Sequence, residues 1–237
     1  MRCNWVKNAL AERNGRDRGP VDNDARSWHA RATSSGKEVP MTIKPPTRPE
    51  RPFRFTREQY YEMGARGYFD GKRVELIFGE IVEMGPIGWP HALAVGLVAD
   101  ALRAAFAIGY WLNIQQPFAV PGSQPGSEPQ PDVAVIPGSP RDCADHPTTA
   151  ALIVEVADTT LSNDTTTKAE LYATAGIADY WVLDVTGREL HVFRDPQPLP
   201  AGLGATAYRT HLTLAPTDRV APLAASAASV LVSDLLP

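Results

Sequence analysis

Two short apolar runs near the middle of the chain each contain a single carboxylate. The runs are PDVAVI at 131–136, which holds Asp132, and AALIVEVA at 150–157, which holds Glu155. Short and nearly continuous apolar runs are typical of strands that are covered on both faces of a sheet. A carboxylate inside such a strand is costly unless it is paired or binds a metal ion. The chain is therefore expected to form a sheet between two layers, with both acids compensated.

Helices and hairpins are predicted around these two strands. The remaining elements expected from the pattern are a helix capped by Thr56, helices over 91–107 and 162–176, hairpins over 73–84 and 179–195, and strands over 110–120 and 208–214. The last helix offers Ser162 or Asp164 as its N-cap and Gly176 as its stop. A mixture of hairpins and helices favours an α/β fold, in which a mixed β-sheet is flanked by helices and preceded by an N-terminal hairpin.

The N-terminal part differs in composition from the rest. Residues 1–54 hold twelve of the 23 Lys and Arg and six of the 27 Asp and Glu, are rich in Pro, Gly and Ser, and lack apolar periodicity. This composition predicts a disordered, basic and Pro-rich extension, followed by one folded domain over 55–237. Met41 resembles a natural start, so residues 1–40 are expected to be an upstream extension outside the natural product. The alternative is a basic arm that holds a polyanion.

The sequence motifs argue against several other classes of protein and of functional site. The two cysteines, Cys3 and Cys143, are far apart and form no CxxC motif, which favours a reduced, cytoplasmic setting. The longest apolar tract carries Asp100 and Arg103 near its centre and is interpreted as a buried helix, not a membrane span. Nucleotide-binding glycine motifs and GxSxG are absent. The histidines lack zinc-ligand spacing, which argues against a hydrolytic zinc site: His29, His91, His146, His191 and His211.

Asp132 and Glu155 are candidates for a metal site. Neighbouring strands lie about 4.8 Å apart, a spacing that lets two carboxylates share one divalent ion. Lys168 follows Glu155 by thirteen residues, and a helix that packs back over its strand would bring this lysine to the same edge. Two acids and a lysine suit hydrolysis of a phosphodiester, because Mg²⁺ polarises the phosphoryl group while lysine orients water or stabilises the developing charge.

Four blocks of sequence in this order resemble the Uma2 family of endonucleases in the PD-(D/E)XK superfamily. The blocks are RVELIFGEIVEMGPIGWPHA, QPDVAVI, LIVEVADTTLSNDTTTKAELYATAGIADYWVLD and ELHVFRDP, and the resemblance covers roughly 55–237. It implies a restriction-endonuclease-like core, Mg²⁺ or Mn²⁺ as the cofactor, and DNA as the substrate. It also implies that Asp132 and Glu155 bind the metal, with the Val156 carbonyl as a further ligand.

The resemblance assigns further residues and contains one departure. Ala157 stands where the superfamily motif has lysine, and the lysine is expected to have moved to Lys168 on the following helix. Glu75 resembles the family's N-terminal acid, which can complete the metal shell, and Glu80 across the tight turn is the alternative. His91 matches a histidine of the family and could hydrogen-bond an acid or contact phosphate.

The leading hypothesis is therefore a Mg²⁺-dependent endodeoxyribonuclease. The alternative is a catalytically weak or inactive nucleic-acid-binding or mobile-element accessory protein with the same fold. In that case Glu155 and Lys168 form a structural ion pair and Asp132 caps loop backbone. After residue 54 the chain has eleven Lys and Arg against twenty-one Asp and Glu, which leaves few cations to hold DNA. A homodimer that pools its basic patches is one remedy.

Overall fold

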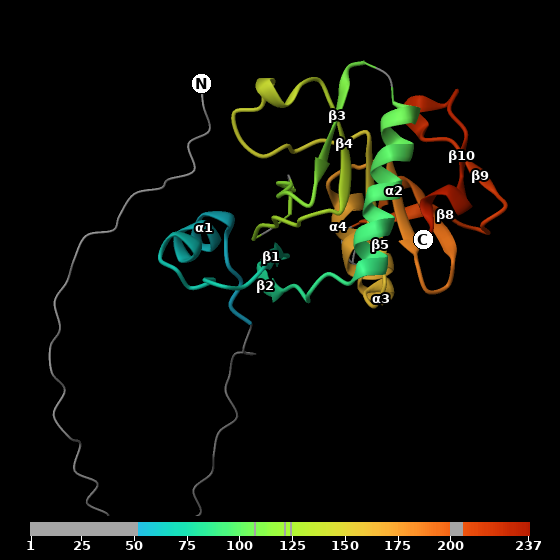
Figure 1. Ribbon diagram of the computed structural model, residues 1–237. Helices are drawn as coiled ribbons and strands as arrows, with labels where there is room; N and C mark the ends of the chain where they lie inside the picture. Colours follow the sequence, from blue (N-terminus) through green and yellow to red (C-terminus); the bar gives the residue numbers. More distant parts are fainter. Residues whose placement is uncertain (1–51, 107, 121, 124, 200–205) are drawn as a thin grey trace, which may run out of the picture. The chain divides into compact units, whose positions relative to one another are not determined.

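A computed structural model describes residues 52–106, 108–120, 122–123, 125–199 and 206–237 (Figure 1). The predicted N-terminal extension, 1–54, lies outside the described residues except for its last three. None of the helices in the described ranges has the length and hydropathy needed to cross a membrane.

The centre of the fold is a six-stranded mixed sheet. Its spatial order is β3-β4-β5-β6-β7-β8. The strands are β3 Tyr110–Ile114, β4 Val133–Pro137, β5 Leu152–Ala157, β6 Asp179–Asp184, β7 Glu189–Pro198 and β8 Thr206–Leu214. Among these described strands only β5 and β6 run parallel, and the other four pairs are antiparallel. The parallel pair needs a crossover, which the helical segment between β5 and β6 supplies. The predicted α/β fold with a mixed sheet and flanking helices is confirmed.

Both faces of the sheet are covered, as the two apolar runs predicted. Helix α2, Trp89–Ala105, contacts β3, β4 and β5 (Figure 1) and shares one apolar core with the C-terminal elements β9, β10 and Val232–Leu235. The opposite core contains Tyr172 of helix α4, Ala169–Thr174. The C-terminal pair, β9 Arg219–Val220 and β10 Val230–Leu231, forms a small separate sheet. Strands β4 and β5 are thus buried on both sides, where an acid must be compensated.

The crossover between β5 and β6 differs from the single helix that the sequence predicts. It consists of α3, Leu161–Asn163, a π-helical turn, Asp164–Lys168, and α4. Its N-cap is Thr160, so the prediction of Ser162 or Asp164 as the cap was wrong. The hydroxyls of Thr165 and Thr166 donate to the backbone carbonyls four residues earlier, at 2.7 and 2.5 Å. Such back-bonding competes with the regular helical ladder and accompanies the wide turn here.

The N-terminal elements of the described chain are a helix and the predicted hairpin. Helix α1, Arg57–Ala65, is capped by Thr56 in a capping box with Gln59. Strands β1, Val74–Ile77, and β2, Glu80–Glu83, form a separate antiparallel pair. Phe78 and Gly79 at the turn both have positive φ, 47° and 78°, as the tight turn of a two-residue hairpin requires. One bridge, from Leu76 to Glu128, links β1 to the loop that precedes β4.

Candidate active site

The side chain of Asp132 hydrogen-bonds to β5 just beyond the point where the backbone pairing of β4 with β5 ends. The last register pair toward this end is Val133 with Val154, and one residue further Asp132 stands opposite Glu155 on the same face. No backbone pair forms there, because Asp132 Oδ2 accepts the Val156 N–H at 2.9 Å. The side chain thus takes the place of a ladder hydrogen bond. Asp132 precedes β4 by one residue, where the sequence predicted it as the first residue of the strand.

The second oxygen of Asp132 contacts two further side chains. His91 Nε2, in the first turn of α2, lies 3.0 Å from Asp132 Oδ1, and Gln115 Nε2 donates to the same oxygen at 3.1 Å. Burial alone raises the pKa of Asp132, but these contacts and the Val156 N–H hold it below its ordinary value. The same pairing raises the pKa of His91, opposed by its own burial. Asp132 is therefore a buried, charged and firmly oriented carboxylate.

Glu155 is buried within β5 and has a different environment. Its Oε1 accepts from Lys168 Nζ at 3.1 Å and from the Tyr172 hydroxyl at 2.7 Å. Burial raises the pKa of Glu155 well above its ordinary value; the positive charge of Lys168 opposes this, and the nearby carboxylates Asp132, Asp164 and Glu75 add to it. A second cation near Glu155 would therefore favour its ionised form.

Lys168 is the buried cation at the centre of the acids. Besides Glu155, its Nζ lies 3.6 Å from Glu75 Oε1 and 3.8 Å from Asp164 Oδ1. Burial alone lowers the pKa of Lys168, but the surrounding carboxylates raise it above its ordinary value, so the ammonium stays charged. The helical crossover thus returns Lys168 to β5, as the sequence predicted. One positive charge is shared among three carboxylates.

The hairpin contributes Glu75 and not Glu80. Glu75 is buried in β1, accepts the Gln130 N–H at 3.2 Å and faces Lys168. Glu80 lies exposed at the start of β2, where it pairs with Arg54. The two glutamates therefore lie in different surroundings, and Glu75 is the one that reaches the site.

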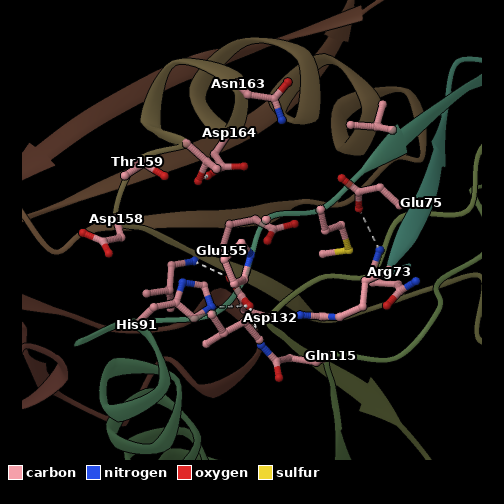
Figure 2. Close-up of a pocket in the computed structure, with 18 of the residues that line it drawn as sticks. Arg73, Glu75, His91, Gln115, Asp132, Glu155, Asp158, Thr159, Asn163 and Asp164 are labelled. Carbon is pink, nitrogen blue, oxygen red and sulfur yellow. Dashed lines mark hydrogen bonds and ion pairs between the residues drawn. The ribbon is translucent and has the colours of Figure 1, made fainter. Parts of the chain in front are cut away.

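A cavity of about 220 Å³ is lined by Glu75, His91, Gln115, Asp132, Glu155 and Lys168 (Figure 2). Its wall includes six acids, namely Glu75, Glu83, Asp132, Glu155, Asp158 and Asp164. The cations in the wall are Lys168 and Arg73, and His91 lies beside Asp132. The cavity therefore has an excess of negative charge, which suits a bound cation.

A family comparison identifies the family to which this chain belongs. The profile of Uma2, described as "Putative restriction endonuclease", matches residues 57–224, which is more than half of the chain. The chain belongs to the Uma2 family. It is accordingly a restriction-endonuclease-like protein, and all the predicted site residues fall within the matched range. No curated protein matched the chain.

A solved structure supports the fold of this Uma2 chain. It is a crystal structure of "a putative nuclease belonging to DUF820" from Anabaena variabilis, with a TM-score of 0.58 and 16% sequence identity. The alignment covers 76% of this chain and 97% of the other. At this identity the likeness concerns the fold alone. Because the family description and this fold agree, the restriction-endonuclease-like core that the sequence predicted is confirmed.

Sequence reasoning missed three residues of the Uma2 site. Asp164 was interpreted as a cap or loop residue, but it is buried and contacts Lys168, and its Oδ2 accepts from the Thr160 hydroxyl at 2.5 Å. Tyr172 binds Glu155, and Gln115 binds Asp132. The available signal was the spacing of Asp164, Lys168 and Tyr172, four residues apart, which places them along one helix face. Gln115 has no comparable local signal.

The acids of the cavity are spread around Lys168 and do not form a compact ligand group. In the described part of the chain, three ligand atoms gather within 4.8 Å of one another at Asp184, Glu189 and His191, which lie outside the cavity. The predicted metal ligands are therefore close enough to perturb one another's charge, as the raised pKa of Glu155 indicates, but are not assembled as a three-residue cage. Magnesium is commonly held by one or two carboxylates together with substrate phosphates, so the arrangement fits that ion.

Proposed function

We propose that this Uma2 chain is a metal-dependent endonuclease that hydrolyses DNA phosphodiester bonds. The observation that carries the proposal is the position of Lys168, 3.1 Å from Glu155 inside a cavity that Asp132 and Glu75 also line. Acids with one lysine at a sheet end are the set of groups that such hydrolysis requires. Membership of a family described as restriction endonucleases supports nucleic acid as the substrate. The activity is assigned to the domain predicted over 55–237.

Asp132 and Glu155 would hold the metal ion, with the Val156 carbonyl and Glu75 as further ligands. All are oxygen donors, which suit Mg²⁺ or Mn²⁺. Glu155 Oε1 is used by Lys168 and Tyr172, and its Oε2 accepts no hydrogen bond from the described residues, so this oxygen is available to a cation. When bound, Mg²⁺ neutralises phosphate charge and lowers the pKa of an attacking water.

Lys168 would act on the phosphate or the attacking water, and His91 would orient the metal ligand Asp132. The Lys168 ammonium is fixed by Glu155, Glu75 and Asp164, so it can donate to a phosphoryl oxygen or to the attacking water without first being ordered. This position replaces the motif lysine that is missing at Ala157. His91 holds Asp132 in one orientation, and its raised pKa favours a proton that could also be donated to phosphate.

Cleavage of plasmid and single-stranded DNA tests the proposal. Purified protein is incubated with each DNA in Mg²⁺, in Mn²⁺ and in EDTA, beside Asp132→Asn and Glu155→Gln. We expect metal-dependent nicking by the unaltered protein and a loss of more than about a hundredfold in either variant, since removing an interaction with developing charge costs about this much. Asp100→Asn and Glu62→Gln are matched controls, because both acids lie exposed on helices away from the cavity.

Each result of this experiment decides between the candidate functions. Equal cleavage by Asp132→Asn, Glu155→Gln and the unaltered protein would contradict the assigned site. Cleavage that persists in EDTA would contradict metal dependence. If DNA is bound but never cut, the chain is instead the non-catalytic nucleic-acid-binding protein of the alternative hypothesis, with Glu155 and Lys168 as a structural ion pair.

A further inference from the structure

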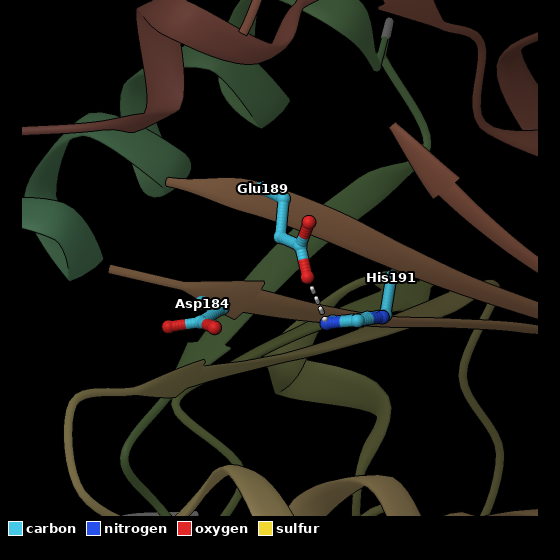
Figure 3. A group of neighbouring side chains, drawn as sticks. All are labelled: Asp184, Glu189 and His191. Carbon is cyan, nitrogen blue, oxygen red and sulfur yellow. Dashed lines mark ion pairs between the residues drawn. The ribbon is translucent and has the colours of Figure 1, made fainter. Parts of the chain in front are cut away.

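Asp184, Glu189 and His191 form a second cluster of metal-ligating side chains, at the β6–β7 hairpin. In the register of this hairpin Asp184 pairs with Glu189, and His191 pairs with Val182. Because side chains alternate along a strand, all three lie on one face of the sheet. One ligand atom from each lies within 4.8 Å of the other two, and His191 Nε2 is 3.2 Å from Glu189 Oε1 (Figure 3).

The imidazole of His191 is held on one side and unsatisfied on the other. Its Nδ1 lies 3.1 Å from His211 Nε2 and 3.3 Å from the Thr213 hydroxyl. Its Nε2 is buried and makes no hydrogen bond to the described residues, because the approach of Glu189 lacks hydrogen-bond geometry. The side chain as a whole is only 12% exposed. A buried polar atom without a hydrogen-bond partner is rare in native proteins, and a bound ion is one of the groups that can satisfy it.

The contact with His211 is compatible with the tautomer of His191 that a metal ion needs. In the tautomer of His211 whose Nε2 carries the lone pair, this nitrogen accepts a hydrogen bond from the Nδ1–H of His191. The lone pair of His191 Nε2 then faces the carboxylates of Asp184 and Glu189. Histidines that bind metals are oriented in this way through their other ring nitrogen.

We propose that Asp184, Glu189 and His191 bind a divalent transition-metal ion of the zinc class. One imidazole nitrogen and two carboxylate oxygens form a donor set that suits zinc, with the fourth position open. Ligand atoms around a tetrahedral ion with bonds of about 2.0–2.1 Å lie roughly 3.4 Å apart. The distance of 3.2 Å between Glu189 Oε1 and His191 Nε2 is already close to this value. All three ligand atoms lie within 4.8 Å of one another, so small side-chain movements would bring them to the distances that the ion requires.

This site is distinct from the cavity of the proposed nuclease. None of its three residues lines the cavity, whose proposed metal ligands are all oxygens. Asp184 is nevertheless in register with Ala157, two residues beyond Glu155, so the cluster lies at the same end of the sheet and one strand further on. Asp184 also accepts the Gly187 N–H at 2.7 Å within the turn of the hairpin. A bound ion would join the ends of β6 and β7 and stabilise this edge of the fold.

Zinc titration of the full-length, untagged protein tests the site. The protein is stripped of metal, both cysteines are replaced by serine to remove competing thiols, and Zn²⁺ is titrated by calorimetry with Mg²⁺ in excess. We expect about one zinc equivalent per chain and a higher thermal midpoint with zinc. Glu189→Gln and His191→Gln should each weaken this binding by more than about tenfold, since even groups that only orient metal ligands are worth that much.

Two controls locate the ion and guard against misfolding. Asp132→Asn should keep the zinc equivalent, because Asp132 belongs to the cavity, and His146→Gln should keep it as a histidine distant in sequence from the hairpin. Glu189 is 38% exposed, so Glu189→Gln is expected to fold, and circular dichroism checks this. Absent zinc binding, unchanged binding in both ligand variants, or loss of the equivalent in Asp132→Asn would each overturn the proposal. Such a result would leave the proposed nuclease untouched.

Discussion

The carboxylate of Asp132 has a structural task as well as a proposed chemical one. It accepts the Val156 N–H in place of a backbone carbonyl and thereby ends the pairing of β4 with β5. A side chain that replaces a ladder hydrogen bond keeps the backbone satisfied while the two strands separate and open a cavity. An uncharged asparagine of the same size can keep that hydrogen bond through its amide oxygen, which makes Asp132→Asn a cleaner test than truncation to alanine.

The pairing of His91 with Asp132 predicts how stability depends on pH without metal. The pKa of His91 is raised from 6.5 by Asp132, by the Val156 backbone and by Asp158. A raised pKa means that the folded protein holds the proton more tightly than the unfolded chain. The stability from this pair is thus complete below about pH 6.5 and is lost as the pH rises through the folded pKa. In EDTA, His91→Gln should flatten the fall in the free energy of unfolding as the pH rises above about 6.5.

Urea denaturation across this range measures the difference between His91→Gln and the unaltered protein. His211→Gln is the control, because the pKa of His211 is lowered and its effect is confined to pH below about 6.5. The raised pKa of Glu155 makes stability fall in the same direction, but that contribution is common to both proteins and cancels in the difference. An identical slope in the two proteins would show that the pair with Asp132 does not hold the His91 proton.

The hairpin of β1 and β2 positions Glu75 through its tight turn, and Gly79 is the residue on which that turn depends. Gly79 has φ of 78°, and a Cβ there would overlap the ring of Pro125 and approach Arg54 Cβ to 2.8 Å. Gly79→Ala therefore adds steric overlap to backbone strain, and we expect it to destabilise the protein by about 2–4 kcal/mol. Displacement of β1 should also move Glu75 away from Lys168.

Gly71→Ala separates the two causes. Gly71 has nearly the same φ, 76°, but a Cβ there meets nothing within 4 Å. Strain alone should cost about 1–2 kcal/mol. Urea denaturation of both variants gives the comparison, and equal losses would mean that the packing of Pro125 and Arg54 on the turn adds nothing.

The strands and the position of Lys168 could be predicted because their signals are local. Apolar runs, turn residues and helix stops are read within a few positions, and the return of a helix over its strand is a general rule. The π-helical turn could not be predicted in this way, and neither could the burial of Asp164. An aspartate that caps a helix and an aspartate inside a π-helical turn cannot be told apart from the local sequence. The cluster of Asp184, Glu189 and His191 depends on the register of a hairpin, which a search for zinc-ligand spacing does not consider.

The distribution of charge over the whole chain bears on how DNA would be held. Residues 1–50 carry ten Lys and Arg against six Asp and Glu, while the remainder carries thirteen against twenty-one. DNA, with one negative charge per phosphate, would be repelled by a domain whose net charge is negative. The acids that line the cavity are part of this negative charge. A bound divalent ion reduces this repulsion only locally, so other cations of the chain are expected to contribute to DNA binding.

Removal of residues 1–50 is therefore expected to weaken DNA binding and its dependence on salt. Each phosphate neutralised by Lys or Arg contributes about 0.9 to the slope of log K against log salt, so the truncated chain should show a shallower slope and lower affinity. Fluorescence anisotropy with a labelled duplex in EDTA, between roughly 50 and 200 mM salt, measures both without cleavage. A full-length variant with the ten Lys and Arg of 1–50 replaced by Gln separates charge from chain length and should behave like the truncation. An unchanged slope in both would assign DNA binding to cations within 51–237, where the thirteen available must then act against the acidic excess.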